Sequence, residues 1–201
     1  HQSVNAAIAL AAAGAFLQRA VNPMALRDGL AAVHPPARVE CVEIAVGRGR
    51  ATVVFDRAHN PDAVAALTRT LRDDLPAAGQ RALVLGVLAG RDLDTMVRAL
   101  DVARYERIVV CSTPTVRGLD AERLAAAVQI HARCAVEVVP DPVTAAALVT
   151  GQARHGDQIV VTGCTYHVAA LREWLLGPVA AAHTATRTTT PTAHAATRSG
   201  R

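Results

Sequence analysis

The 201-residue sequence contains no lysine, so all 21 of its basic residues are arginine, against 17 acidic residues. The arginines are scattered along the chain rather than gathered in runs, which gives little support for a nucleic-acid partner. Aromatic residues make up only 2% of the chain. This scarcity excludes a stacking platform for single-stranded bases. It also leaves valine, leucine, isoleucine and alanine to fill the core, as in parallel sheets that are covered on both faces.

Three further absences limit the function classes. No apolar stretch is long enough to span a membrane, and the apolar opening 4–17 lacks the basic residues that start a signal peptide, so we expect a cytoplasmic protein with no membrane partner. The four cysteines form no CxxC pair and no cysteine–histidine cluster, which predicts reduced thiols and no metal site. No GxxxxGKS/T motif occurs, so the chain cannot build a phosphate loop of its own.

Apolar periodicity predicts strands that alternate with helices over most of the chain. Two helices come first, at 2–19 and 22–33, and a hairpin of two strands follows. The expected strands cover 39–44, 51–55, 82–88, 108–112, 136–139 and 158–162, and the later helices cover 61–75, 93–100, 120–131, 142–154 and 166–176. This order is typical of a Rossmann-like α/β fold, with a mostly parallel sheet of about six strands, one of them antiparallel, and helices on both faces.

The same pattern divides the chain into three parts. Residues 1–34 form a helical segment that starts without an initiator methionine, and we expect it to be the end of a preceding domain. His34-Pro35-Pro36 serves as a linker to the α/β domain, residues 35–177. Residues 178–201 are rich in alanine, threonine, histidine and arginine without apolar periodicity, which predicts a disordered tail.

The segment ATVVFDRAHNPDAVAAL, residues 51–67, carries the main candidate site. A strand stops at Asp56 and a helix starts at Asn60-Pro61, so Asp56 and His59 share one strand-to-helix turn. Ligands of open α/β sheets bind at the carboxyl ends of the strands, where N–H groups of the next helix face anions. Each residue alone is compatible with a simple cap or turn, but their joint placement favours nucleotide or acyl chemistry.

Several motifs resemble the C-terminal domain of folylpolyglutamate synthase and dihydrofolate synthase, members of the Mur ligase superfamily of ATP-dependent amide ligases. DRAHNP resembles the family motif DGAHNP, and VTGCTYHVAALREWL resembles VTGSLYLVGEVR. The other similar segments are HQSVNAAIALAA at 1–12, PPARVECV at 35–42 and GVLAGRD at 86–92. Departures from the family pattern include Arg57 for glycine, Arg91 for lysine and Cys164 for serine.

The resemblance implies a role for each matched residue. It implies that Asp56 and His59 are catalytic and face the nucleotide and the incoming glutamate, that Arg38 reaches the ATP phosphates, and that Asn5 bonds the adenine. Cys164 is implied to lie at the glutamate site, where a thiol is a weaker hydrogen-bond partner than the family's hydroxyl. The resemblance also implies that residues 1–34 are a remnant of the central ATPase domain.

The implied reaction adds glutamate to a folate or dihydropteroate through an acyl phosphate. ATP and Mg²⁺ are bound mainly by an upstream phosphate-loop ATPase domain, so this chain alone is expected to be inactive. Two alternatives stay open: a non-catalytic module that binds a nucleotide or an amino acid, and the C-terminal domain of another Mur-type ligase. The AHNP tetrad favours the folate branch over other Mur-type ligases.

Overall fold

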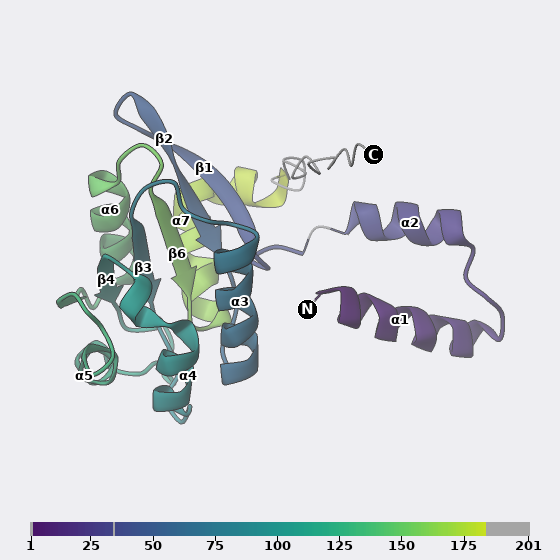
Figure 1. The fold of residues 1–201 in the computed structure, drawn as a ribbon, viewed down its shortest axis with the longest axis horizontal. Helices are drawn as coiled ribbons and strands as arrows, with labels where there is room; N and C mark the ends of the chain where they lie inside the picture. The colour runs from purple at the N-terminus through teal and green to yellow at the C-terminus, as the bar shows by residue number, and fades with distance from the viewer. Residues whose placement is uncertain (1, 34, 184–201) are drawn as a thin grey trace, which may run out of the picture.

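The computed structural model, which describes residues 2–33 and 35–183, is centred on a six-stranded sheet (Figure 1). The strands lie in the order β1-β2-β6-β3-β4-β5. Their bounds are β1 Glu40–Val46, β2 Gly49–Phe55, β3 Arg81–Leu85, β4 Arg107–Val110, β5 Val136–Val138 and β6 Gln158–Thr162. β1 pairs antiparallel with β2 through a two-residue turn, and every other neighbouring pair is parallel. The predicted fold class is therefore confirmed.

Short polar caps start the helices of the α/β domain where the sequence predicts them. The Asn60 side chain accepts from the N–H of Ala63, and the Asp92, Asp120 and Asp141 side chains cap the next three helices in the same way. The helices are α3 Pro61–Asp73, α4 Leu93–Leu100, α5 Ala121–Gln129, α6 Pro142–Gln152 and α7 Thr165–His183, with a short 3₁₀ turn η1 at Val102–Arg104.

The helices cover the sheet on two faces. Helices α3, α4 and α5 bury apolar side chains against one face, with Val54, Leu83 and Val160 at its centre. Helices α6 and α7 cover the other face, which presents Phe55 and Val161. Burying one such side chain contributes about 1.5–3 kcal/mol, so aliphatic packing is enough to hold these layers with few aromatic rings.

Two helices precede the α/β domain and lie beside it (Figure 1). They are α1 Gln2–Leu17 and α2 Pro23–Ala32, and the side chain of Asn22 caps α2. Apolar side chains on them, including Phe16 and Met24, are exposed. No helix among the described residues is both long and apolar enough to cross a membrane.

Two element ends differ from the sequence prediction by more than two residues. β3 ends at Leu85 rather than at residue 88, because the chain then leaves the sheet and Leu88 bridges to Gly118 in a loop. α7 continues past residue 176 to His183 after a break at Gly177, whose φ is 71°. Residues 178–183 of the predicted tail are thus helical, while the rest of that tail, 184–201, lies outside the described residues.

The position of β6 determines where a ligand can enter. β6 lies between β2 and β3, and it leads into α7 on one face of the sheet. Both neighbouring strands lead into helices on the opposite face, α3 and α4. Connections that leave adjacent strands towards opposite faces mark the usual ligand position of an open α/β sheet. A ligand site is therefore expected at the carboxyl ends of β6 and its neighbouring strands.

Candidate functional site

The turn that follows β2 is organised by the carboxylate of Asp56. Its Oδ2 accepts from the N–H of Val39 at 2.8 Å and its Oδ1 accepts from the N–H of Ala58 at 2.8 Å. The residue is buried, and burial raises the pKa of Asp56, an effect that these hydrogen bonds and the charges of Arg38 and Arg57 partly offset. Both oxygens are thus engaged in holding the backbone, which makes Asp56 an anchor for this turn.

The segment held by Asp56 includes two residues with unusual backbone angles. Ala37 and Val39 both have a φ of 52°, a conformation that a β-branched residue such as Val39 rarely adopts. The N–H of Arg57 also donates to the carbonyl of Ala37 at 3.0 Å. The backbone on either side of Arg38 is therefore fixed to the turn that carries Asp56.

A second carboxylate holds the same segment from the other side. Glu40 Oε2 accepts from the N–H of Ala37 at 2.8 Å, and Arg172 of α7 forms two hydrogen bonds with Glu40, at 2.7 and 2.8 Å. The side chains of Glu40 and Arg172 are only 15% and 12% exposed. Burial acts to raise the pKa of Glu40, but the hydrogen bonds from Arg172 and Ala37 outweigh it and leave this pKa below its usual value. No motif or local pattern in the sequence indicates this pair.

His59 lies at the exposed end of the turn. Its Nδ1 is 2.9 Å from the carbonyl oxygen of Arg57, and a carbonyl only accepts, so a neutral imidazole carries its proton on Nδ1. Nε2 then has a free lone pair. Among the residues that the structure describes, those other than glycine with a positive φ are Gln18, Ala37, Val39 and Asp101. Arg57, at the family's glycine position, is not among them, so this substitution does not strain the described backbone.

The start of the loop after β6 meets this turn directly. The N–H of Gly163 donates to the carbonyl of Ala58 at 3.2 Å, and the N–H of Asp56 donates to the carbonyl of Val161 at 3.0 Å. Gly163 has a φ of 116°, and a Cβ there would lie 2.4 Å from the carbonyl oxygen of Gly86. This close approach requires glycine. The ends of β2, β6 and β3 are thus brought together.

Behind this edge lies a buried polar cluster that the sequence reasoning missed. The Sγ of Cys164 is 3.6 Å from Thr113 Oγ1 and accepts from the N–H of His167. The Sγ of Cys111 is 3.6 Å from His167 Nδ1. Burial raises the pKa of Cys111 to about 12 and lowers the pKa of His167 to about 4, so the pair is neutral at pH 7. Because Cys164 is only 1% exposed, its thiol packs inside the domain and cannot touch a substrate in this arrangement.

The buried imidazole predicts a specific pH dependence of stability. Unfolding returns the pKa of His167 to about 6.5, so the unfolded chain binds a proton between pH 6.5 and 4 that the folded chain excludes. The free energy of unfolding therefore falls as the pH drops through this window, by about 3 kcal/mol from this group. Urea unfolding at pH 7 and pH 4.5 measures the loss. The variant His167→Leu should lose less stability over the same window, and an equal loss would contradict this assignment.

The structure places the other predicted residues apart from the turn or at its margin. Arg38 is exposed, and its charge acts on the carboxylate of Asp56. Asn5 is exposed on α1, which lies outside the α/β layers (Figure 1). Arg38, Arg57 and the N-terminus of α3 together offer donors suited to phosphate oxygens. Among the described residues, no group of three or more histidine, cysteine or acidic side chains could hold a metal ion.

Known proteins with a similar sequence share this domain. The family model "Mur ligase, glutamate ligase domain" matches residues 37–165. Dihydrofolate synthase/folylpolyglutamate synthase of Mycobacterium tuberculosis is 38% identical over 133 residues, which cover 63% of this chain and 26% of that protein. UDP-N-acetylmuramoyl-L-alanyl-D-glutamate–2,6-diaminopimelate ligase of Streptomyces avermitilis is 36% identical over 167 residues, covering 79% of this chain and 31% of that protein.

A solved structure shows the same architecture. Mycobacterium tuberculosis folylpolyglutamate synthase complexed with ADP and AMPPCP aligns with a TM-score of 0.73 and 31% identity, over 88% of this chain and 40% of that one. The chain thus spans at most about two fifths of each of these relatives. The resemblance identified from the sequence motifs is confirmed.

Proposed function

Because the chain belongs to the Mur ligase superfamily, we propose that it supplies one wall of the site in which an ATP-dependent ligase adds glutamate to a folate or dihydropteroate. The observation that carries this proposal is the meeting of the Asp56 turn with Gly163, at strand ends whose connections diverge. A full ligase also needs a phosphate loop, which this sequence lacks, so an upstream ATPase domain is the expected partner.

Nucleotide binding is assigned to the residues around the Asp56 turn. ATP, when bound, supplies the phosphoryl group that activates the acceptor carboxylate as an acyl phosphate. Arg38 and Arg57 provide guanidinium groups towards its phosphates, and the α3 N-terminus adds backbone donors. Asp56 acts as a positioning residue, because it holds Val39 and therefore Arg38 in place. Asn5 on α1 is proposed to bond the adenine, and Mg²⁺ is assigned to the upstream domain.

His59 is proposed to act on the incoming amino acid. Its Nδ1 faces the carbonyl of Arg57, so its Nε2 is able to accept a proton or a hydrogen bond from the ammonium group of glutamate. Cys164 supports the glutamate site from inside, by packing with Thr113 beneath the loop after β6. The cytoplasm remains the proposed location for this reaction.

A chimera in which residues 35–177 replace the corresponding domain of the Mycobacterium tuberculosis relative tests the proposal. We expect ADP release to rise at least about tenfold when a folate and glutamate are both present, over either one alone. The 201-residue chain alone should release no ADP. ADP release that does not depend on folate and glutamate, or ADP release by the chain alone, would contradict the proposal.

The match to a diaminopimelate-adding ligase supports a second candidate, another Mur-type reaction with a different acceptor and amino acid. A second chimera, built in the same way on the Streptomyces avermitilis relative, distinguishes the two when it is assayed with UDP-N-acetylmuramoyl-L-alanyl-D-glutamate and diaminopimelate. A non-catalytic binding module is the third outcome. It predicts heat of binding with ATP or glutamate in calorimetry and no ADP release from either chimera with its substrate pair.

A further inference from the structure

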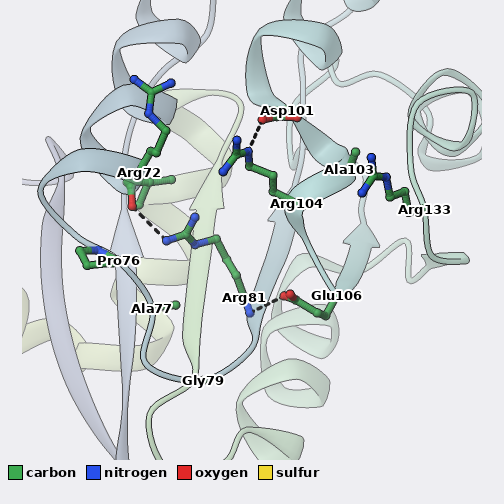
Figure 2. A pocket seen from close by; sticks show the side chains of 11 residues that line it. Arg72, Pro76, Ala77, Gly79, Arg81, Asp101, Ala103, Arg104, Glu106 and Arg133 are labelled. Carbon is green, nitrogen blue, oxygen red and sulfur yellow. Dashed lines mark hydrogen bonds and ion pairs between the residues drawn. The ribbon is translucent and has the colours of Figure 1, made fainter.

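A cavity of about 660 Å³ lies at the amino ends of β3 and β4 (Figure 2). The Asp56 turn follows the carboxyl end of β2, so the two lie at opposite ends of the sheet. The cavity is formed by the end of α3, the loop that leads to β3, the connection between α4 and β4, and Arg133 after α5. Its charged lining residues are Arg72, Arg81, Asp101, Arg104, Glu106 and Arg133. These positions surround the amino ends of the parallel strands, so a ligand there would not compete with one at the Asp56 turn.

Positive charge predominates in this cavity. Four arginines line it, against two carboxylates, Asp101 and Glu106. Arg72 also pairs with Asp73 just outside the lining, which reduces the excess to one positive charge. No lysine or aromatic ring of the described chain lines this cavity, so its cationic groups are all guanidinium groups. Guanidinium groups bind planar or tetrahedral oxyanions by paired hydrogen bonds.

Two of the arginines have donors left for a ligand. Arg104 uses its Nε towards Asp101, and no hydrogen bond is recorded for its Nη atoms within the described part of the chain. Arg133 is exposed and has no ion pair among the described residues. In Figure 2 the guanidinium group of Arg104 lies between those of Arg81 and Arg133. These side chains present several N–H groups to one space.

Arg81 also lines the cavity, but its side chain is hydrogen-bonded to the protein itself. Its Nη2 donates to the carbonyls of Leu71 and Leu75 at 3.0 and 3.2 Å, and its Nε donates to Gln158. These bonds satisfy the carbonyls at the end of α3. Arg81 therefore fixes the shape of the cavity, while Arg104 and Arg133 remain available to a ligand.

We propose that this cavity binds a small multivalent oxyanion, with Arg104 and Arg133 as its ligating side chains. A single carboxylate would leave most of the volume and most of the guanidinium N–H donors unused, whereas a chain of phosphates or of carboxylates would occupy both. Its lining offers no aromatic face for a nucleobase, so recognition is directed to the oxyanion groups. This proposal is independent of the ligase reaction and concerns a second site on the same domain.

Titration calorimetry of the 201-residue chain at low salt tests the proposal with two probes, inorganic tripolyphosphate and tri-glutamate peptide. We expect one binding event with at least one of them, weakened by added salt. The variant Arg104→Gln/Arg133→Gln should weaken it at least tenfold. Both residues are exposed, and loss of the exposed Asp101 pair should cost little stability. The melting temperature checks that the variant is folded.

The matched control is Arg117→Gln/Arg123→Gln, which removes the same charge from exposed positions outside the cavity lining. It should keep the affinity within about twofold at constant salt. Equal weakening in both double variants would show a nonspecific charge effect and overturn the site. Unchanged affinity in Arg104→Gln/Arg133→Gln, or no binding of either probe at millimolar concentration, would overturn it as well. The probe that binds decides between phosphate and carboxylate chains.

Discussion

Replacing Arg172 by methionine should lower the free energy of unfolding at pH 7 by up to about 3–5 kcal/mol, because it leaves the largely buried carboxylate of Glu40 without its partner. Methionine keeps much of the volume of the arginine side chain, so the main loss is the paired charge. Glu40 also holds the N–H of Ala37, and the strained segment 37–39 should loosen with it. Urea unfolding followed by circular dichroism measures the change.

The pH dependence separates this cause from simple loss of packing. In the native chain the low pKa of Glu40 stabilises the fold above about pH 4.3, and this contribution is lost as the pH falls through the folded value. In Arg172→Met the unpaired carboxyl can protonate, so the deficit should shrink towards pH 4. The control Arg98→Met breaks an exposed pair with Asp94 and should cost under about 1 kcal/mol. A deficit of similar size in both variants would contradict the account.

Replacing Asp56 by alanine should cost about 2–4 kcal/mol of stability, since it removes the acceptor of two backbone N–H groups at once. In the chimera it should also reduce turnover at least about tenfold, equivalent to about 1.4 kcal/mol of barrier. The physical reason is that Val39 is no longer held, and Arg38 beside it loses its fixed position. Denaturant unfolding and ADP release from the same preparation measure both effects.

Asp62→Ala provides the matched control for this variant. Asp62 is exposed in the first turn of α3, only six residues from Asp56, and its removal should cost at most about 1 kcal/mol through the helix dipole. Turnover of the control should remain near that of the unchanged chimera. If Asp56→Ala turned over at the unchanged rate while folded, its positioning role would be wrong.

Local signals in the sequence were sufficient to predict most of the fold. The cap at Asn60-Pro61 and the alternation of apolar strands with helices are local properties, and they fix the type and order of the elements. The motif around Asp56 also predicted its turn, because a strand end and a helix start lie within a few residues. These features depend only on residues that are close together in the sequence, so the sequence alone is enough to predict them.

Long-range contacts could not be predicted in this way. Nothing in the sequence places β6 between β2 and β3, and this placement is what brings Gly163 to the Asp56 turn. The Glu40–Arg172 pair joins residues 132 positions apart. His167 stands where the family signature has leucine, but only its burial beside Cys111 shows that it is neutral. The strained φ of Val39 likewise depends on the distant carboxylate of Asp56.

The role of the Asp56 turn in the reaction is decided by the rate of ADP formation in the chimera carrying His59→Ala, with folate, glutamate and ATP at saturation. His131, which pairs with Asp94 and is not part of the turn after β2, supplies the comparison variant His131→Ala. We expect a rate at least about tenfold lower for His59→Ala and an unchanged rate for His131→Ala. Equal rates for the His59→Ala and unmodified chimeras would show that the turn after β2 takes no part in the chemistry.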